Sequence, residues 1–172
     1  MKKNLKILII QTAFIGDLII STPVFREIRN KYPDAKVHVL AIPSSASIIK
    51  HDPHIDKIFL FNKKNGSVNK LKSFISLIKS FRNERYDLGI SLQNSFTSSL
   101  LMKLSGVRHF IGGNEQKFSD ENVSLSEGMH SRLKMLEYLK QAGIDIKSTD
   151  TEIHLSEKET RKADSIIKMN NS

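Results

Sequence analysis

A continuous apolar run near the amino terminus constrains the fold more than any other feature of this sequence. Residues 5–10 read Leu-Lys-Ile-Leu-Ile-Ile, which is typical of a strand buried on both faces of a parallel sheet. Residues 11–16 form a short turn with one glycine, and Asp17 begins a segment whose apolar residues recur with helical spacing. A strand, a turn and a helix in this order predict the first βα unit of an open α/β sheet.

Asp17 is the first carboxylate to consider for chemistry, because ligands of open α/β sheets bind outside the carboxyl ends of the strands. An aspartate in the first turn of a helix also commonly accepts hydrogen bonds from free backbone N–H groups. The two interpretations are compatible, since a carboxylate that caps a helix beside a cleft can still accept a proton.

The rest of the chain continues the alternation of strands and helices. Strands are predicted within residues 36–42, 55–61, 88–92, 106–112 and 151–155. Helices are predicted within residues 44–50, 67–85, 95–104, 130–143 and 156–169, and the polar residues 113–128 are predicted to form a loop. This alternation predicts a single domain over residues 1–172, with a doubly wound, mostly parallel Rossmann-like α/β sheet and helices on both faces.

The composition is that of a globular chain. Hydrophobic residues make up 39% and charged residues 26%, and no apolar run reaches the roughly 18 residues of a transmembrane helix. The lack of cysteine excludes disulfides and thiolate metal sites. His51 and His54, beside Pro53, are interpreted as loop residues rather than metal ligands. We therefore expect a cytoplasmic protein without a bound metal.

The charge balance favours anionic partners, since 27 Lys and Arg against 18 Asp and Glu give a formal charge of +9. Nucleic acid is not expected as a partner, because no nucleic-acid-binding motif occurs and the basic residues are not interleaved with aromatic ones. Residues 67–85 place Lys70, Lys72 and Lys79 opposite an apolar helical face. Such a helix can lie on an anionic membrane surface, although packing of its apolar face on the sheet is the favoured interpretation.

Two common ligand sites of α/β proteins are not supported. A dinucleotide fingerprint needs three glycines in the first βα turn, whereas residues 11–16 contain only Gly16. The second predicted strand ends without an acidic residue for a ribose hydroxyl, and the phosphate-binding GxxxxGK[ST] motif does not occur.

Several blocks of the sequence instead resemble family 9 glycosyltransferases, the ADP-heptose:lipopolysaccharide heptosyltransferases. In chain order these blocks are IGDLIISTPVFREIRNKYPDAKVHVL, IDKIFLF, YDLGISLQNSFTSSLLMKLSGVRHFIGG and HSRLKMLEYLKQAGI. The resemblance implies a GT-B enzyme with two facing Rossmann-like domains. The amino-terminal domain would bind the acceptor, a growing lipopolysaccharide core on lipid A. The carboxy-terminal domain would hold most of the site for the ADP-heptose donor, and transfer would invert the anomeric centre without a metal or cofactor.

The resemblance also implies site residues. The aspartate of the family's GD motif is its proposed general base and corresponds to Asp17. An acceptor hydroxyl is a poor nucleophile, and a carboxylate within hydrogen-bond reach can take its proton as the new bond forms. Gly16 would let the acceptor approach the backbone closely. Further substrate contacts are expected from Thr12, Gln93, Asn94, Ser95, Arg108 and His130. For Arg108 and His130, ordinary surface or capping roles are equally open.

The chain departs from the family pattern in three ways. Many relatives carry an arginine at the position of Gln11 and a basic residue near Thr97, so two anion contacts are expected to be lost. The sequence also ends where the carboxy-terminal donor domain is expected to begin, and a donor domain or second chain is expected to be needed for activity. The alternative is a non-catalytic α/β module that binds an anionic glycolipid or nucleotide. Because the implied acceptor is a lipid, peripheral contact with the cytoplasmic face of the inner membrane is expected.

Overall fold

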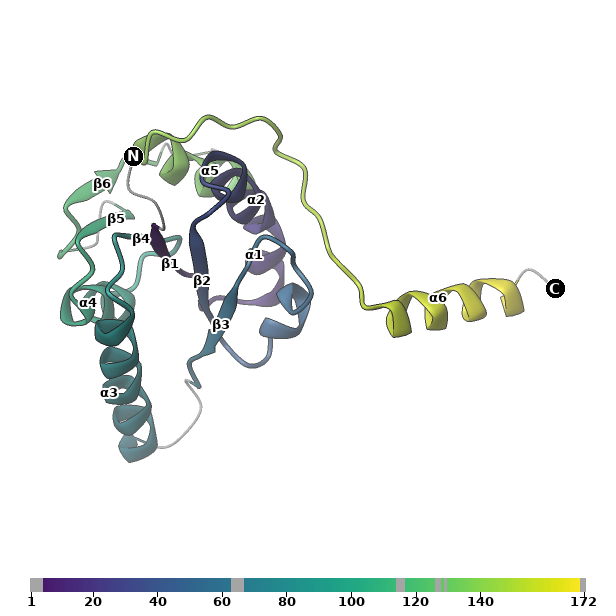
Figure 1. The fold of residues 1–172 in the computed structure, drawn as a ribbon, viewed down its shortest axis with the longest axis horizontal. Coiled ribbons are helices and arrows are strands. Elements are labelled where there is room, and N and C mark those ends of the chain that lie inside the picture. Colours follow the sequence, from purple (N-terminus) through teal and green to yellow (C-terminus); the bar gives the residue numbers. More distant parts are fainter. Residues whose placement is uncertain (1–4, 63–66, 114–116, 126–127, 129, 171–172) are drawn as a thin grey trace.

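The computed structural model describes residues 5–62, 67–113, 117–125, 128 and 130–170. Its centre is one six-stranded sheet in the order β3-β2-β1-β4-β5-β6 (Figure 1). All five pairs of neighbouring strands are parallel. The strands are β1 (Lys6–Ile10), β2 (Lys36–Ala41), β3 (Lys57–Leu60), β4 (Leu88–Ser91), β5 (His109–Gly113) and β6 (Glu121–Val123). The predicted Rossmann-like α/β fold is confirmed.

Helices cover both faces of this sheet (Figure 1). The helices of the described chain are α1 (Ile15–Ile20), α2 (Thr22–Lys31), the 3-10 turn η1 (Ala46–Ile49), α3 (Ser67–Glu84), α4 (Phe96–Ser105), α5 (Ser131–Gln141) and α6 (Glu157–Asn170). Helix α6 lies away from the sheet, at the end of an extended segment (Figure 1). Helices α1, α2 and α5 pack on one face, and α3 and α4 pack on the other. None of the helices in the described ranges is long and apolar enough to cross a membrane.

Strand β1 shows why the apolar run sets this architecture. Ile7 and Ile9 join the core cluster beneath α1, α2 and α5, whereas Leu8 and Ile10 join the cluster beneath α3 and α4. All four side chains are fully buried. A strand that is covered by helices on both faces has no side exposed to solvent, so its sequence is a nearly continuous hydrophobic stretch.

The first predicted helix is interrupted in the structure. It begins at Ile15 rather than Asp17, and Ser21 separates α1 from α2. The Ser21 hydroxyl donates to the backbone oxygen of Asp17 at 2.6 Å. Pro23, in the first turn of α2, has no N–H group to continue the hydrogen bonds of α1.

The sixth strand is not where the sequence pattern placed it. Residues 151–155 are extended but form no strand, because side chains of α2 take the place of a neighbouring strand. Arg26 donates to the backbone oxygens of Ser148 and Asp150, and the N–H of Glu152 donates to the Thr22 hydroxyl at 3.0 Å. The strand at the edge is instead β6, inside the predicted loop 113–128. A three-residue strand is too short to show periodicity.

Candidate functional site

The turns that follow β1, β2, β3 and β4 meet at the carboxyl edge of the sheet. Together they line an open cavity of about 620 Å³. Strand order reverses between β1 and β4, which makes this place the topological switch point where open α/β sheets bind ligands. The lining includes Thr12 and Phe14 after β1, Pro43 after β2, Asn62 after β3, and residues 93–95 after β4.

The Gln93 side chain connects the segments that follow the two central strands, β1 and β4. Its side-chain amide donates to the Thr12 hydroxyl, and also to the Ser98 hydroxyl in α4 at 2.9 Å. Thr12 and Ser98 are both buried. The Gln93 amide therefore links the turn after β1 to the start of α4. The sequence prediction that Thr12 and Gln93 share one site is consistent with this geometry.

Asp17 lies beside the main cavity, in the first turn of α1. It lines a smaller hollow of about 170 Å³ together with Asn94, Ser131 and Lys134. The residue that caps α1 is Phe14, whose side chain makes no capping hydrogen bond. Among the described residues, the Asp17 carboxylate accepts no hydrogen bond, and only its backbone oxygen is used, by Ser21. The capping interpretation therefore has no hydrogen bond to support it, and the carboxylate is open to a ligand.

Asn94 lines both hollows and is the residue between Asp17 and the main cavity. Its side chain rests against the end of β5, where Gly113 makes room for it. A Cβ atom on Gly113 would lie 2.0 Å from the Asn94 Oδ1 and 2.9 Å from the Tyr138 hydroxyl. Burial raises the pKa of Tyr138 to about 12, so this hydroxyl keeps its proton at neutral pH. Gly113 thus leaves the space that the Asn94 side chain occupies, a role that was not predicted from the sequence.

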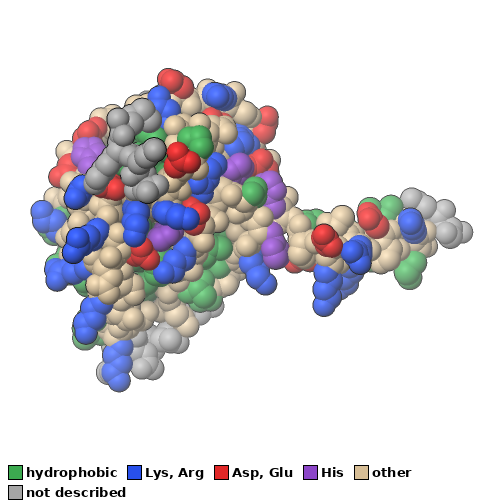
Figure 2. All heavy atoms as spheres, viewed as in Figure 1, with side chains coloured by type: hydrophobic (Ala, Val, Ile, Leu, Met, Phe, Trp, Pro, Cys, Tyr) green, Lys and Arg blue, Asp and Glu red, His purple; other side chains and the backbone are tan. Residues whose placement is uncertain are grey.

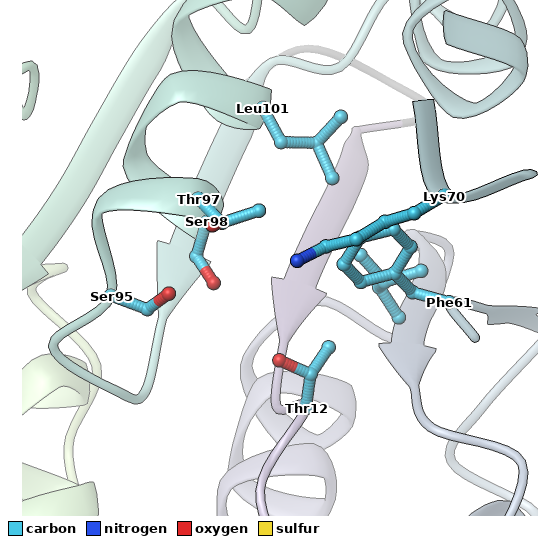
Figure 3. Close-up of a pocket in the computed structure, with 8 residues that line it drawn as sticks. Thr12, Phe61, Lys70, Ser95, Thr97, Ser98 and Leu101 are labelled. Carbon is cyan, nitrogen blue, oxygen red and sulfur yellow. The ribbon is translucent and has the colours of Figure 1, made fainter. Parts of the chain in front are cut away.

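A third hollow, of about 130 Å³, lies between α3 and α4 (Figure 3). Hydroxyls of Ser95, Thr97 and Ser98 line one side, and the Lys70 side chain extends from α3 toward them. The sequence analysis placed Lys70 on the outer face of its helix. Its position in the first turn of a helix that follows β3 was the available signal, since such a turn begins above the carboxyl edge.

Gln11, the position where relatives carry arginine, is fully buried. Its amide donates to the Ser21 hydroxyl at 3.0 Å and lies 3.8 Å from the sulfur of Met135. Its carbonyl oxygen has no hydrogen-bond partner in the described part of the chain. Gln11 therefore lies beneath α1 and is not exposed in the cavity.

The remaining predicted residues fall in different places. Arg108 precedes β5 at the amino edge of the sheet, where it forms an ion pair with Asp87 at 3.0 Å, so the structure does not bring it to the other candidates. His130 caps α5, and its Nδ1 accepts a hydrogen bond from the N–H of Arg132 at 3.3 Å, in agreement with the capping alternative. Gly16 is exposed, with no atom within 4 Å of the position of an added Cβ.

The sequence matches known proteins along most of its length. A profile of glycosyltransferase family 9 (heptosyltransferase) matches residues 74–171. Lipopolysaccharide heptosyltransferase 3 of Escherichia coli K12 is 31% identical over 150 residues, which cover 83% of this chain and 44% of that protein. Lipopolysaccharide heptosyltransferase 2 of the same strain is 28% identical over 108 residues, covering 63% of this chain and 31% of that protein. The chain thus spans less than half the length of these curated relatives.

Solved structures share the fold at lower identity. A family 9 glycosyltransferase from Veillonella parvula DSM 2008 superposes with a TM-score of 0.82 at 17% identity, covering 98% of this chain and 50% of that one. The E. coli heptosyltransferase WaaC with ADP-2-deoxy-2-fluoro heptose superposes with a TM-score of 0.74 at 15% identity, covering 86% of this chain and 51% of that one. The profile match and the curated relatives identify the chain as a member of glycosyltransferase family 9 (heptosyltransferase).

Proposed function

We propose that this chain supplies the acceptor-binding domain and the general base of a heptosyltransferase, which moves heptose from ADP-heptose to a lipopolysaccharide core acceptor. The names of the curated relatives and the sugar nucleotide bound to WaaC support this choice of substrates. The observation that carries the proposal is the Asp17 carboxylate, which lines a hollow at the carboxyl edge and accepts no hydrogen bond from the described residues.

The proposed reaction is a direct displacement with inversion. An acceptor hydroxyl beside Asp17 attacks the anomeric carbon of the heptose, the bond from that carbon to the phosphate oxygen breaks, and ADP leaves with the electron pair. Asp17 takes the hydroxyl proton as the new glycosidic bond forms, which prevents positive charge from building up on the attacking oxygen. Asn94, between Asp17 and the main cavity, is placed to orient the acceptor by hydrogen bonds. This scheme requires no metal or cofactor.

The donor is proposed to bind between this domain and a second domain or chain. Both substrates must be held together for the reaction to become effectively unimolecular. The open carboxyl edge, with its cavity of about 620 Å³, is the surface that would face such a partner. Lys70 would supply the positive charge for an anionic group of the acceptor, in place of the basic residue expected near Thr97.

A lipid-linked acceptor also suggests peripheral contact with the inner membrane. Leu71 and Ile75 of α3 are 59% and 44% exposed, with Lys72 and Lys79 beside them on the same helix. Figure 2 shows Lys and Arg side chains along the α3 side of the molecule. Apolar side chains among lysines can dock on anionic lipid head groups. Co-sedimentation with anionic but not neutral vesicles, lost when both apolar residues are changed to serine, would support this contact.

The central test is a sugar-transfer assay with ADP-heptose and a lipid A core acceptor. The chain is assayed alone and joined to the carboxy-terminal domain of a family relative, each with Asp17 and with Asp17→Asn. We expect transfer only by the joined protein and a fall of about 10²–10⁴-fold in kcat with Asp17→Asn. Circular dichroism checks that the fold is unchanged.

The outcomes separate the proposal from its alternative. Transfer that survives Asp17→Asn would remove the proposed base while leaving the heptosyltransferase assignment in place. A joined protein that binds acceptor or nucleotide but transfers no sugar, with several carboxy-terminal domains, would favour the non-catalytic binding module.

A further inference from the structure

Two histidines and two carboxylates that are far apart in the sequence come together beside α2. Asp52 and His54 follow η1, and Glu152 and His154 lie in the extended segment before α6. Asp52, His54 and His154 each offer one ligand atom, and these atoms all lie within 4.8 Å of one another. Glu152 adds a second carboxylate, whose Oε1 is 3.1 Å from the Nε2 of His54 and 3.5 Å from the Nε2 of His154.

These spacings are those of ligands around a small cation. Zinc binds histidine nitrogens at about 2.0–2.1 Å and carboxylate oxygens at about 2.0–2.2 Å, so tetrahedral neighbours lie roughly 3.3–3.5 Å apart. The two contacts of Glu152 with the imidazoles, at 3.1 and 3.5 Å, match that separation. The ligand oxygen of Asp52 lies within 4.8 Å of the ligand nitrogens of both imidazoles.

Several buried atoms of this cluster form no hydrogen bond within the described part of the chain. The Oδ1 of Asp52 accepts from the N–H of His54 at 2.9 Å, but its Oδ2 is buried and has no hydrogen-bond partner among the described residues. The Oε1 of Glu152 and the Nε2 of His154 also form no hydrogen bond with a described residue, and their close contacts are the ion-pair contacts given above. Asp52 as a whole is only 6% exposed. A buried carboxylate oxygen without a partner is costly, and a cation at the centre of the cluster would satisfy it.

Contacts from α2 anchor the two segments that carry these four residues. Arg26 of α2 holds the backbone at Ser148 and Asp150 and lies 3.4 Å from the second oxygen of Glu152. Arg29, also in α2, donates to the backbone oxygen of His54 at 3.1 Å. The ligands therefore come from two segments that are anchored independently on one helix, which is the kind of support that orients metal ligands.

We propose that Asp52, His54, Glu152 and His154 form a binding site for a divalent transition-metal ion, with zinc as the best fit. Two imidazoles and two carboxylates form a ligand set that suits zinc, whereas magnesium and calcium prefer oxygen ligands alone. From the sequence, His54 was interpreted as a loop residue because no carboxylate-rich or HExxH context surrounds it. Of its proposed partners, Asp52 is close in the sequence, but Glu152 and His154 lie about a hundred residues away.

Such a site would act as a clamp. It would join the loop after η1 to the extended segment that leads from the sheet to α6, a segment without strand pairing of its own (Figure 1). The direction in which the chain leaves the domain would then depend on the metal. This inference is independent of the proposed sugar transfer, and its test uses no glycosyl substrate.

The test is zinc binding by the full 172-residue chain, produced without a polyhistidine tag and stripped with a chelator. We expect one zinc ion per chain by calorimetry and a melting temperature raised by about 5 °C or more at a hundredfold excess over the Kd. Magnesium should give neither effect. Cobalt bound in place of zinc should show visible absorption of a four- or five-coordinate site with nitrogen ligands.

His154→Gln and His54→Gln should each weaken zinc binding by at least about 100-fold and abolish the cobalt spectrum. His51→Ala is the matched control, because His51 lies in the same loop but its Nε2 is 3.8 Å from Glu159 rather than in the cluster. It should bind zinc as the unaltered chain does. No zinc binding by the unaltered chain would overturn the proposal, as would binding that His154→Gln and Asp52→Asn, both shown to be folded by circular dichroism, leave unchanged.

Discussion

The two edges of the same parallel sheet are built from different chemistry. At the amino edge, two aspartates are engaged within the protein: Asp56 accepts from Arg29 at 2.7 Å and from the N–H of Val37 at 2.8 Å, and Asp87 accepts from the N–H of Lys6 and from Arg108. At the carboxyl edge the linkers are neutral amides and hydroxyls, such as those of Gln93 and Thr12. The carboxylate there, that of Asp17, accepts no hydrogen bond from the described residues.

The difference follows from what each edge has to do. Charged groups that are paired within the protein stabilise the fold, but they cannot change partners without cost. A binding edge needs charges that are still available, on a framework fixed by other means. Here Gln93 and the glycine at the end of β5 provide that framework, and charged side chains that line the hollows include those of Asp17, Lys134 and Lys70. Substitutions of the paired carboxylates at the amino edge should therefore alter stability, and substitutions of the charged side chains that line the hollows at the carboxyl edge should alter activity.

The largest stability effect is expected for Asp56→Ala at the amino edge. The change removes the acceptor of both Arg29 and the Val37 N–H, and should lower the free energy of unfolding by about 2–3 kcal/mol. Urea denaturation measures this difference. Asp34→Ala is the control, since Asp34 is exposed in the turn between α2 and β2, and it should stay within about 0.5 kcal/mol of the unaltered protein. Equal effects of the two changes would show that the hydrogen bonds of Asp56 do not stabilise the amino edge.

Acidification should weaken the amino edge in the same way. Burial alone would raise the pKa of Asp56, but hydrogen bonds from Val37 and Arg29 and the charges of Arg29 and Lys36 hold it below its usual range. Because the unfolded state then binds more protons, the stabilisation is complete above the unfolded pKa of about 3.9 and is lost as the pH falls through the lower folded pKa. Denaturation between pH 6 and pH 3 should show this loss, with a shallower slope in Asp56→Ala. Identical slopes would show that Asp56 is not the group responsible.

At the carboxyl edge, Lys70→Met should lower kcat/KM for the acceptor by about tenfold, equivalent to about 1.4 kcal/mol, in the joined protein that carries a donor domain. The methionine keeps the apolar stem beside Phe61 and removes only the charge that faces the hollow. Lys103→Met is the control, because Lys103 is exposed on the neighbouring helix α4 and does not line the hollow. If both changes reduce kcat/KM equally, the effect is one of overall charge rather than of a contact in the hollow.

The sequence predicted the parts of this comparison that depend on periodicity. The buried run of β1 and the alternation of strands and helices led to the correct fold, and parallel strands necessarily bring Asp17 and Gln93 to one edge. Lys70 was missed because helical spacing identifies the apolar face of a helix but not the direction in which a long side chain bends at its first turn. The His54–Glu152 contact and the anchoring of the segment 148–152 by α2 were missed because they join residues that no local pattern relates.

The smallest effect is expected for Arg108→Ala, which decides whether the amino edge takes part in acceptor binding. Resemblance to the family made Arg108 a candidate contact, but the structure pairs it with Asp87 and leaves its side chain 65% exposed. An exposed ion pair is worth about 0.2–1 kcal/mol, so the melting temperature should fall only slightly and kcat/KM for the acceptor should not change. A loss of activity without a change in stability would mean that the acceptor reaches around the sheet to this edge, and the division between a stabilising edge and a binding edge would then fail. Sodium chloride should remove the small difference in melting temperature between Arg108→Ala and the unaltered protein, because that difference arises from an ion pair at the surface, which salt screens.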